Sequence, residues 1–128
     1  CPPTLSTITL NGMAAADSIL IPVQSEFYAL EGMTQLLNTI HICKKNLNPN
    51  LHIEGILMTM YMTNTNLSES VLNEVKKYFS DQLFDVVIRR SISIAEAPSY
   101  GQPIMYYNKN SNGARDYLQL AKEVINNG

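Results

Sequence analysis

Three short apolar runs, separated from one another by helical patterns, constrain the fold of this chain most strongly. The runs cover residues 18–23 (SILIPV), 53–61 (IEGILMTMY) and 83–88 (LFDVVI). Apolar runs of this length, rich in isoleucine and valine, are typical of parallel strands that are buried on both faces. Because strands and helices alternate, the sequence predicts an α/β fold with a mostly parallel sheet flanked by helices. Three strands are few where roughly five or six are usual, which indicates that strands are missing from the front of the sheet.

Four helical patterns accompany these strands. A short helix is expected at 8–16 and a long helix at 28–47. The third helix begins with a capping box of Asn66 and Glu69, and the last follows the capping residue Ser111. Apolar side chains recur in the last three at intervals of three and four residues, which predicts one buried face on each. These faces comprise Met33, Leu36, Leu37, Ile40, Cys43 and Leu47, then Leu67, Val71, Val75 and Tyr78, and finally Ala114, Tyr117, Leu118, Ala121, Val124 and Ile125.

The segment 89–109 interrupts this regular alternation. It contains Pro98, Gly101 and Pro103, so it cannot form one continuous helix or strand. We expect a long loop with room for one helical turn. Loops of this length are usually functional or mobile.

Length and charge limit the possible classes of function. The chain has 128 residues, of which 45% are hydrophobic and 16% charged, and this fits a single folded domain over 1–128. Its formal net charge of −2 gives no global positive field, so any DNA binding must come from a local patch. No apolar run reaches the roughly 18 to 20 residues that span a bilayer, and the start lacks a signal-peptide pattern. We therefore expect a cytoplasmic protein without membrane binding, in which Cys1 and Cys43 are free thiols.

Ligands of open parallel sheets bind beyond the carboxyl ends of the strands, so the candidate site follows Val23, Thr59 and Ile88. The phosphate-binding patterns GxxxxGKS/T and GxGxxG are both absent from the chain. His41 and His52 have no partner at ligand spacing, so no metal site is expected.

Three methionines recur at every second position of the second apolar run. Met58, Met60 and Met62 would share one face of a strand, and this favours core filling over a binding stripe.

Three long stretches of the chain resemble the ParA family, called Soj in its chromosomal form, among the ParA/MinD deviant P-loop ATPases. They cover residues 1–40, 54–79 and 95–124, and the most specific runs are PVQSEFYALEG and EAPSYGQP. The resemblance implies the latter half of a doubly wound, mostly parallel P-loop NTPase-like sheet. It implies further that the phosphate loop, the first switch and an aspartate lie upstream of Cys1. Cys1, Pro2 and Pro3 would then begin the second switch, and the helix at 8–16 would be the element that it moves.

The resemblance also implies a nucleotide site. In this family ATP or ADP with Mg²⁺ is held between two subunits of a homodimer, the dimer binds DNA nonspecifically, and a ParB-type partner stimulates hydrolysis. The loop that faces the nucleotide across the dimer would contain Gln24, Ser25, Glu26 and Tyr28. The region around the base would contain Thr59, Met60, Arg89 and Arg90.

Two departures from the family pattern bear on DNA binding. Where the family commonly reads TMYDARTNLS, this chain reads TMYMTNTNLS, with Met62 at the aspartate and Asn64 at the arginine. Where it commonly reads VIPRNVRLSEAPS, this chain reads VIRRSISIAEAPS, with Arg89 at the proline and Ser93 at the second arginine. Loss of two phosphate contacts should weaken DNA binding and its salt dependence. Compensating contacts would come from Arg89, Arg90 and Arg115.

The resemblance leads to a first hypothesis: the chain is the carboxy-terminal portion of a ParA/Soj-type ATPase for chromosome or plasmid segregation. The parent would be nucleoid-associated, and this chain alone would be inactive because it lacks the P-loop lysine. A second hypothesis is a self-sufficient α/β protein-binding adaptor without nucleotide. A third is a MinD-like positioning ATPase, which needs an amphipathic carboxy-terminal helix, whereas here the apolar face of that helix is expected against the core. An open sheet edge further predicts a homodimer, with exchanged elements as one way to form it.

Overall fold

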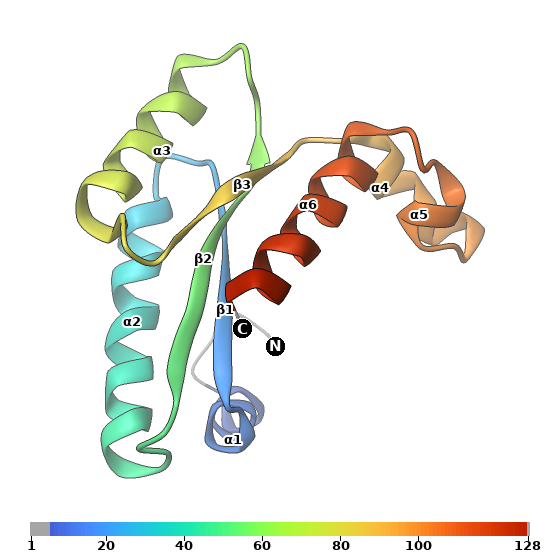
Figure 1. Cartoon of the computed structure of the whole chain (residues 1–128). Helices are drawn as coiled ribbons and strands as arrows, with labels where there is room; N and C mark the ends of the chain where they lie inside the picture. Colours follow the sequence, from blue (N-terminus) through green and yellow to red (C-terminus); the bar gives the residue numbers. More distant parts are fainter. Residues whose placement is uncertain (1–5, 128) are drawn as a thin grey trace.

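The computed structural model describes residues 6–127, which form a three-stranded parallel sheet between helices (Figure 1). The strands β1 (Ser18–Gln24), β2 (His52–Tyr61) and β3 (Leu83–Arg89) pair in the order β1-β2-β3. Helices α2 and α3 lie on one side of the sheet and α6 lies on the other. The predicted α/β class, the parallel sheet and the flanking helices are confirmed.

Helices α2 (Ala29–Asn46) and α3 (Asn66–Phe79) cover the first face of the sheet and enclose the larger core. Cys43 of α2 is a buried free thiol, as predicted, while Cys1 lies outside the described residues. Leu47, predicted on the buried face, is exposed at the end of α2. The fully buried side chains at the centre of this core are Ile21, Cys43, Leu51, Ile56, Met58 and Val75.

The start of α3 differs from the prediction by one residue. Thr65 is the N-cap, in an extended conformation, and its hydroxyl accepts a hydrogen bond from the backbone N–H of Ser68. The predicted capping box of Asn66 and Glu69 is therefore wrong, because a threonine hydroxyl one residue earlier satisfies the first turn. Only the middle of the predicted apolar face is buried, since Leu67 is exposed at its start.

Helix α6 (Asn112–Asn127) covers the second face beside β3. Ser111 caps it as predicted, and its Oγ accepts from the backbone N–H of Ala114 at 3.1 Å. Leu120 and Val124 pack against the smaller core of Leu57, Phe84 and Ile88.

The predicted buried face of α6 is wrong for much of its length. Ala114 is buried, but Tyr117, Leu118 and Ala121 are exposed, and Ile125 is 76% exposed. The expectation that the core covers the apolar face of the carboxy-terminal helix is therefore also wrong.

Two carboxylates of α6 explain this orientation, because they bind the free edge of β3. The Glu123 carboxylate accepts from the backbone N–H groups of Asp85 and Val86 at 2.7 and 3.2 Å. Asp116 Oδ2 accepts from the backbone N–H of Arg89 at 2.9 Å. Polar contacts turn this side of α6 toward the sheet, and they satisfy edge donors that would otherwise be open to another strand.

The segment 89–109 is not one regular element, as predicted, but it contains three short helices where room for one turn was expected. They are α4 (Ile92–Glu96), the 3-10 helix η1 (Ala97–Tyr100) and α5 (Ile104–Tyr107). We call residues 91–108 the C-terminal lobe. Gly101, at φ 63°, ends η1 in the left-handed conformation that glycine adopts without strain.

A single amide holds the end of helix α1 (Thr7–Ala15). The helix is close to the range predicted for it, and among its residues only Thr9 and Met13 are buried. Asn48 Nδ2 lies 2.8 to 3.1 Å from the carbonyl oxygens of Met13, Ala14 and Ala16. The turn between α2 and β2 therefore caps α1.

Candidate functional site

The carboxyl ends of β1 and β2 are tied together by hydrogen bonds between Ser25 and Thr59. The carbonyl oxygen of Thr59 accepts from both the backbone N–H and the hydroxyl of Ser25, each at 3.0 Å. Thr59 Oγ1 in turn donates to the carbonyl oxygen of Val23 at 3.3 Å. Two segments of the candidate site, 34 residues apart in sequence, therefore form one unit.

The loop after β1 presents its other side chains to solvent. Gln24, Glu26 and Tyr28 are exposed, whereas Ser25 is buried. Phe27, which is not among the predicted site residues, is 77% exposed and packs edge-on against Tyr28 with ring centroids 5.2 Å apart. A large exposed aromatic pair at a strand end is a common feature of contact surfaces.

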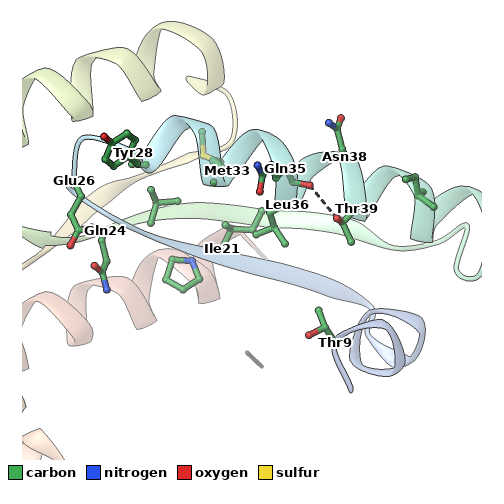
Figure 2. Close-up of a pocket in the computed structure, with 15 residues that line it drawn as sticks. Thr9, Ile21, Gln24, Glu26, Tyr28, Met33, Gln35, Leu36, Asn38 and Thr39 are labelled. Atoms are coloured by element: carbon green, nitrogen blue, oxygen red, sulfur yellow. Dashed lines mark hydrogen bonds between the residues drawn. The ribbon is translucent and has the colours of Figure 1, made fainter. Parts of the chain in front are cut away.

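A groove of about 930 Å³ runs along β1, between that strand and α2 (Figure 2). Gln24 and Glu26 lie at one end of it, and Thr9 of α1 lies at the other. Polar side chains of α2, including Gln35 and Asn38, join the lining, and no motif in the sequence pointed to them. The groove follows the strand edge that has no partner among residues 6–127.

Met60 does not fill the core as the period of the methionines predicted. Met58 is completely buried, but Met60 is 52% exposed and Met62 is also exposed. Met60 has φ 53°, the left-handed region, and it is the one non-glycine residue between 6 and 127 with positive φ. This conformation interrupts the alternation on which the prediction depended.

Arg89, which the family resemblance assigns to the base region and to DNA contacts, forms an ion pair with Asp116. Its Nε and Nη2 donate to the buried carboxylate of Asp116 at 3.0 and 2.7 Å. This hydrogen bond raises the pKa of the Arg89 guanidinium, partial burial opposes the rise, and the charge of Asp116 adds to it. Asp116 was missed because a lone aspartate in a helical stripe gives no recognisable pattern.

The other two arginines remain available for ligands. Arg90 and Arg115 both have exposed side chains, and their backbone N–H groups donate to the carbonyl oxygens of Tyr61 and Ser111 respectively. Of the two residues that the family resemblance places at arginine positions, Asn64 is exposed and Ser93 Oγ accepts from Asn108 Nδ2 at 3.2 Å. Cys1, Pro2 and Pro3, which the family resemblance assigns to the second switch, lie outside the described residues.

No group of three or more His, Cys, Asp or Glu side chains that could hold a metal ion occurs within residues 6–127. In the same part of the chain, every helix is too short or too polar to cross a membrane.

The C-terminal lobe contains a tyrosine that should lose its proton only at high pH. Tyr107 Oη donates to Glu96 Oε2 at 2.7 Å, and its ring stacks on that of Tyr100. The hydrogen bond, followed by desolvation and the Glu96 charge, raises the pKa of Tyr107 from 10.0 to about 12. Because the folded-state pKa is raised, this contact should stabilise the lobe fully below pH 10 and be lost as the pH rises toward 12.

Tyrosinate absorbance during a pH titration tests this expectation. A transition near pH 12 should appear, and Tyr107→Phe should remove it. Glu96→Gln should move it to lower pH, because a neutral amide no longer opposes the phenolate. A titration in which the Phe variant keeps the late transition would contradict the assignment.

Comparisons with known proteins agree with this architecture. A family model described as an AAA domain matches residues 1–53. Across all 128 residues the chain is 53% identical to the sporulation initiation inhibitor protein Soj of Bacillus subtilis (strain 168) and covers 51% of it. It is 48% identical over 125 residues to the chromosome partitioning protein ParA of Myxococcus xanthus (strain DK1622), with 98% of this chain and 44% of that protein aligned. The chain thus spans about half the length of the curated relatives it matches.

Solved structures give the same fold. A crystal structure of cobyrinic acid a,c-diamide synthase from Mycobacterium smegmatis superposes with a TM-score of 0.73 and 31% identity, covering 95% of this chain and 43% of that one. Crystal structures of that synthase with ADP and magnesium, and with an ATP analogue and magnesium, superpose equally well.

Proposed function

We propose that this chain, a member of the ParA/Soj family of partitioning ATPases, provides one half of a nucleotide-binding domain. The whole protein would be a chromosome or plasmid segregation ATPase. The observation that supports this most directly is the 53% identity to Soj over every residue of the chain. Relatives named as chromosome partitioning proteins match at similar levels along nearly the whole chain. These matches support membership of the family, and we propose the ATPase activity for the whole protein.

The open edge of β1 supports the view that the sheet continues in the active protein. The backbone N–H and C=O groups of odd-numbered residues in β1 point toward β2. This follows because the N–H of Ser25 donates to the carbonyl of Thr59 and the carbonyl of Asp17 accepts from the N–H of His52. Pro22 therefore faces the open side, where its missing N–H leaves no donor unsatisfied. The groove beside this edge has room for a further element of the fold. Polypeptide equivalent to the half of Soj that this chain does not match would occupy it.

Nucleotide binding is proposed at the carboxyl ends of the strands, where parallel sheets bind ligands. Gln24, the last residue of β1, and Glu26, in the loop that follows, line one end of the groove (Figure 2). Thr59 and Met60 lie just before Tyr61, the last residue of the neighbouring strand β2, and Arg90 follows β3. ATP or ADP with Mg²⁺ is the proposed ligand, since the structurally similar synthase has been crystallised with ADP or an ATP analogue and magnesium. A homodimer around this site and a ParB-type partner are part of the proposal.

DNA binding is proposed to be weak in this protein. Arg89 is held by Asp116, so Arg90 and Arg115 are the remaining candidates among the three arginines considered. Two cations release few counterions from DNA, so the affinity should be low and should fall only gently with salt. A cytoplasmic, nucleoid-associated location also belongs to the proposal.

A fusion of this chain to the half of Bacillus subtilis Soj that it does not match tests the proposed function. We expect the fusion to bind and hydrolyse ATP with Mg²⁺, and the chain alone to show no turnover above a buffer blank. Intact Soj serves as the positive control, and circular dichroism verifies that the fusion is folded. A folded fusion that binds no nucleotide would refute the proposal, as would sustained turnover by the purified chain alone.

A further inference from the structure

The end of β2 contains an extra residue that changes the direction of its side chains. Met58 is paired with Val87 and Tyr61 with Arg89, so two residues of β2 lie opposite the single residue Ile88 of β3. An arrangement of two residues against one is a β-bulge, and bulges beside functional sites re-aim a side chain. Here the residue with positive φ is Met60, in a position where glycine is the residue without strain.

The left-handed conformation of Met60 is unfavourable for a residue with a side chain, and such strain persists only where the surroundings impose it. The residue before Met60 is fixed by three hydrogen bonds: Thr59 accepts two from Ser25 and donates one to Val23. The residue after it is fixed by the bond from the Arg90 N–H to the Tyr61 carbonyl at 2.9 Å. Both neighbours of Met60 are therefore held in place.

The bulge moves a large apolar side chain from the core to the surface. With regular alternation, Met60 would be buried like Met58, which has no exposed area, yet half of Met60 is exposed at the carboxyl end of the sheet. A thioether in this position offers a flexible, polarisable surface that packs well against aromatic rings. Strain and lost burial both lower stability, so folding alone does not account for the arrangement.

We propose that Ser25 and Thr59 are positioning residues that hold Met60 in its strained conformation, so that its side chain forms an apolar platform for the planar ring of a ligand. This inference rests on the proposed function for the identity of the ring, a nucleotide base. The positioning itself concerns the chain without ligand. Ser25 acts through Thr59 and Met60 and needs no contact with the ligand.

Paired substitutions at Met60 test the strain. Met60→Gly should raise the melting temperature relative to Met60→Ala by roughly 2 to 8 °C, because glycine adopts positive φ freely while alanine does not. In an ordinary strand position the order reverses, since glycine loses more freedom on folding. An alanine variant as stable as the glycine variant, or more so, would overturn the claim of strain.

The methyl signals of ¹³C-labelled methionine test the role of Ser25. In the native chain the Met60 methyl should give a sharp signal whose chemical shift differs from that of a free methionine. The methyl should also be accessible to a soluble paramagnetic agent. In Ser25→Ala, and more so with Thr59→Val added, it should shift toward the value of a free methionine, while the core methyls of Met33 and Met58 stay in place. Ser25→Thr keeps a hydroxyl and should restore the native signal. An unchanged Met60 signal in the double variant would overturn the positioning role.

The fusion with the unmatched half of Soj separates this inference from the proposed function. If the fusion binds ATP, Met60→Gly should weaken that binding at least 5-fold to 10-fold, a loss of the size expected for a base–side-chain contact. Equal affinity of the two forms would overturn the platform. If the native fusion binds no ATP while the methyl and melting results hold, the proposed function fails and the positioning of Met60 by Ser25 stands.

Discussion

Replacing Asp116 with alanine should lower the free energy of unfolding by about 3 kcal/mol, the lower end of the range for breaking a buried ion pair. The Asp116 carboxylate accepts two hydrogen bonds from the Arg89 guanidinium and one from its backbone N–H. The lower end applies because the Arg89 side chain is 34% exposed, so water can solvate part of the charge that is left. Urea unfolding followed by circular dichroism gives the measurement.

Three further variants show whether the ion pair is responsible. Asp116→Asn keeps one acceptor and should lose less than alanine. Arg89→Met leaves the Asp116 carboxylate buried without its cation and should lose a similar amount, while the double variant Arg89→Met with Asp116→Leu should recover part of the loss. Because the pKa of Arg89 is raised from an already high value, its contribution should persist across neutral and mildly alkaline pH. Additive losses in the double variant would contradict a coupled pair.

Replacing Gly55 with alanine should destabilise the protein by about 1 to 3 kcal/mol, the usual effect of overfilling a core. A Cβ atom at Gly55 would overlap the ring of Phe84, which is buried on the adjacent strand. The ring cannot move away freely, because Leu57, Ile88 and side chains of α6 surround it. Thermal unfolding of the variant should therefore shift to lower temperature, and Gly55→Val should shift it further.

Gly32 provides a matched control on helix α2, where a Cβ atom would meet nothing within 4 Å. Gly32→Ala should stabilise the chain by roughly 0.5 to 1 kcal/mol, because alanine favours the helix interior. Adding Phe84→Leu to Gly55→Ala should recover part of the lost stability by freeing space. A Gly55→Ala variant as stable as the native chain would contradict the close contact between Gly55 of β2 and Phe84 of β3.

The strands and long helices could be predicted because burial alone decides them. The apolar runs beginning at Ser18 and Leu83 became strands within a residue or two of the predicted bounds, since few other structures hide so many adjacent apolar side chains. The buried face of α6 could not be predicted in the same way. There, the hydrogen bonds that Asp116 and Glu123 accept from backbone N–H groups of β3 outweigh the burial of Tyr117 and Ile125.

The candidate site was predictable in location and much less so in detail. The general rule for parallel sheets, together with the family resemblance, selected Gln24, Ser25 and Thr59, which the structure brings together. The exposure of Met60 depends on a bulge, and a bulge is a relation between two strands that the sequence of one strand does not contain. The engagement of Arg89 likewise depends on an aspartate 27 residues away, and pairing across that distance becomes visible only in three dimensions.

The carboxylates that α6 places on β3 also limit the ways in which copies of this sheet could join through their edges. A parallel sheet with two free edges can add copies end to end, with the last strand of one joining the first strand of the next, and such growth has no natural limit. Here Glu123 and Asp116 accept from the N–H groups of Asp85, Val86 and Arg89 at one edge, and the edge of β1 stays open within residues 6–127. A molecule with a single accepting edge has a valency of one: it can be completed by one partner, or paired once with its own copy, but it cannot form a fibre through its sheet.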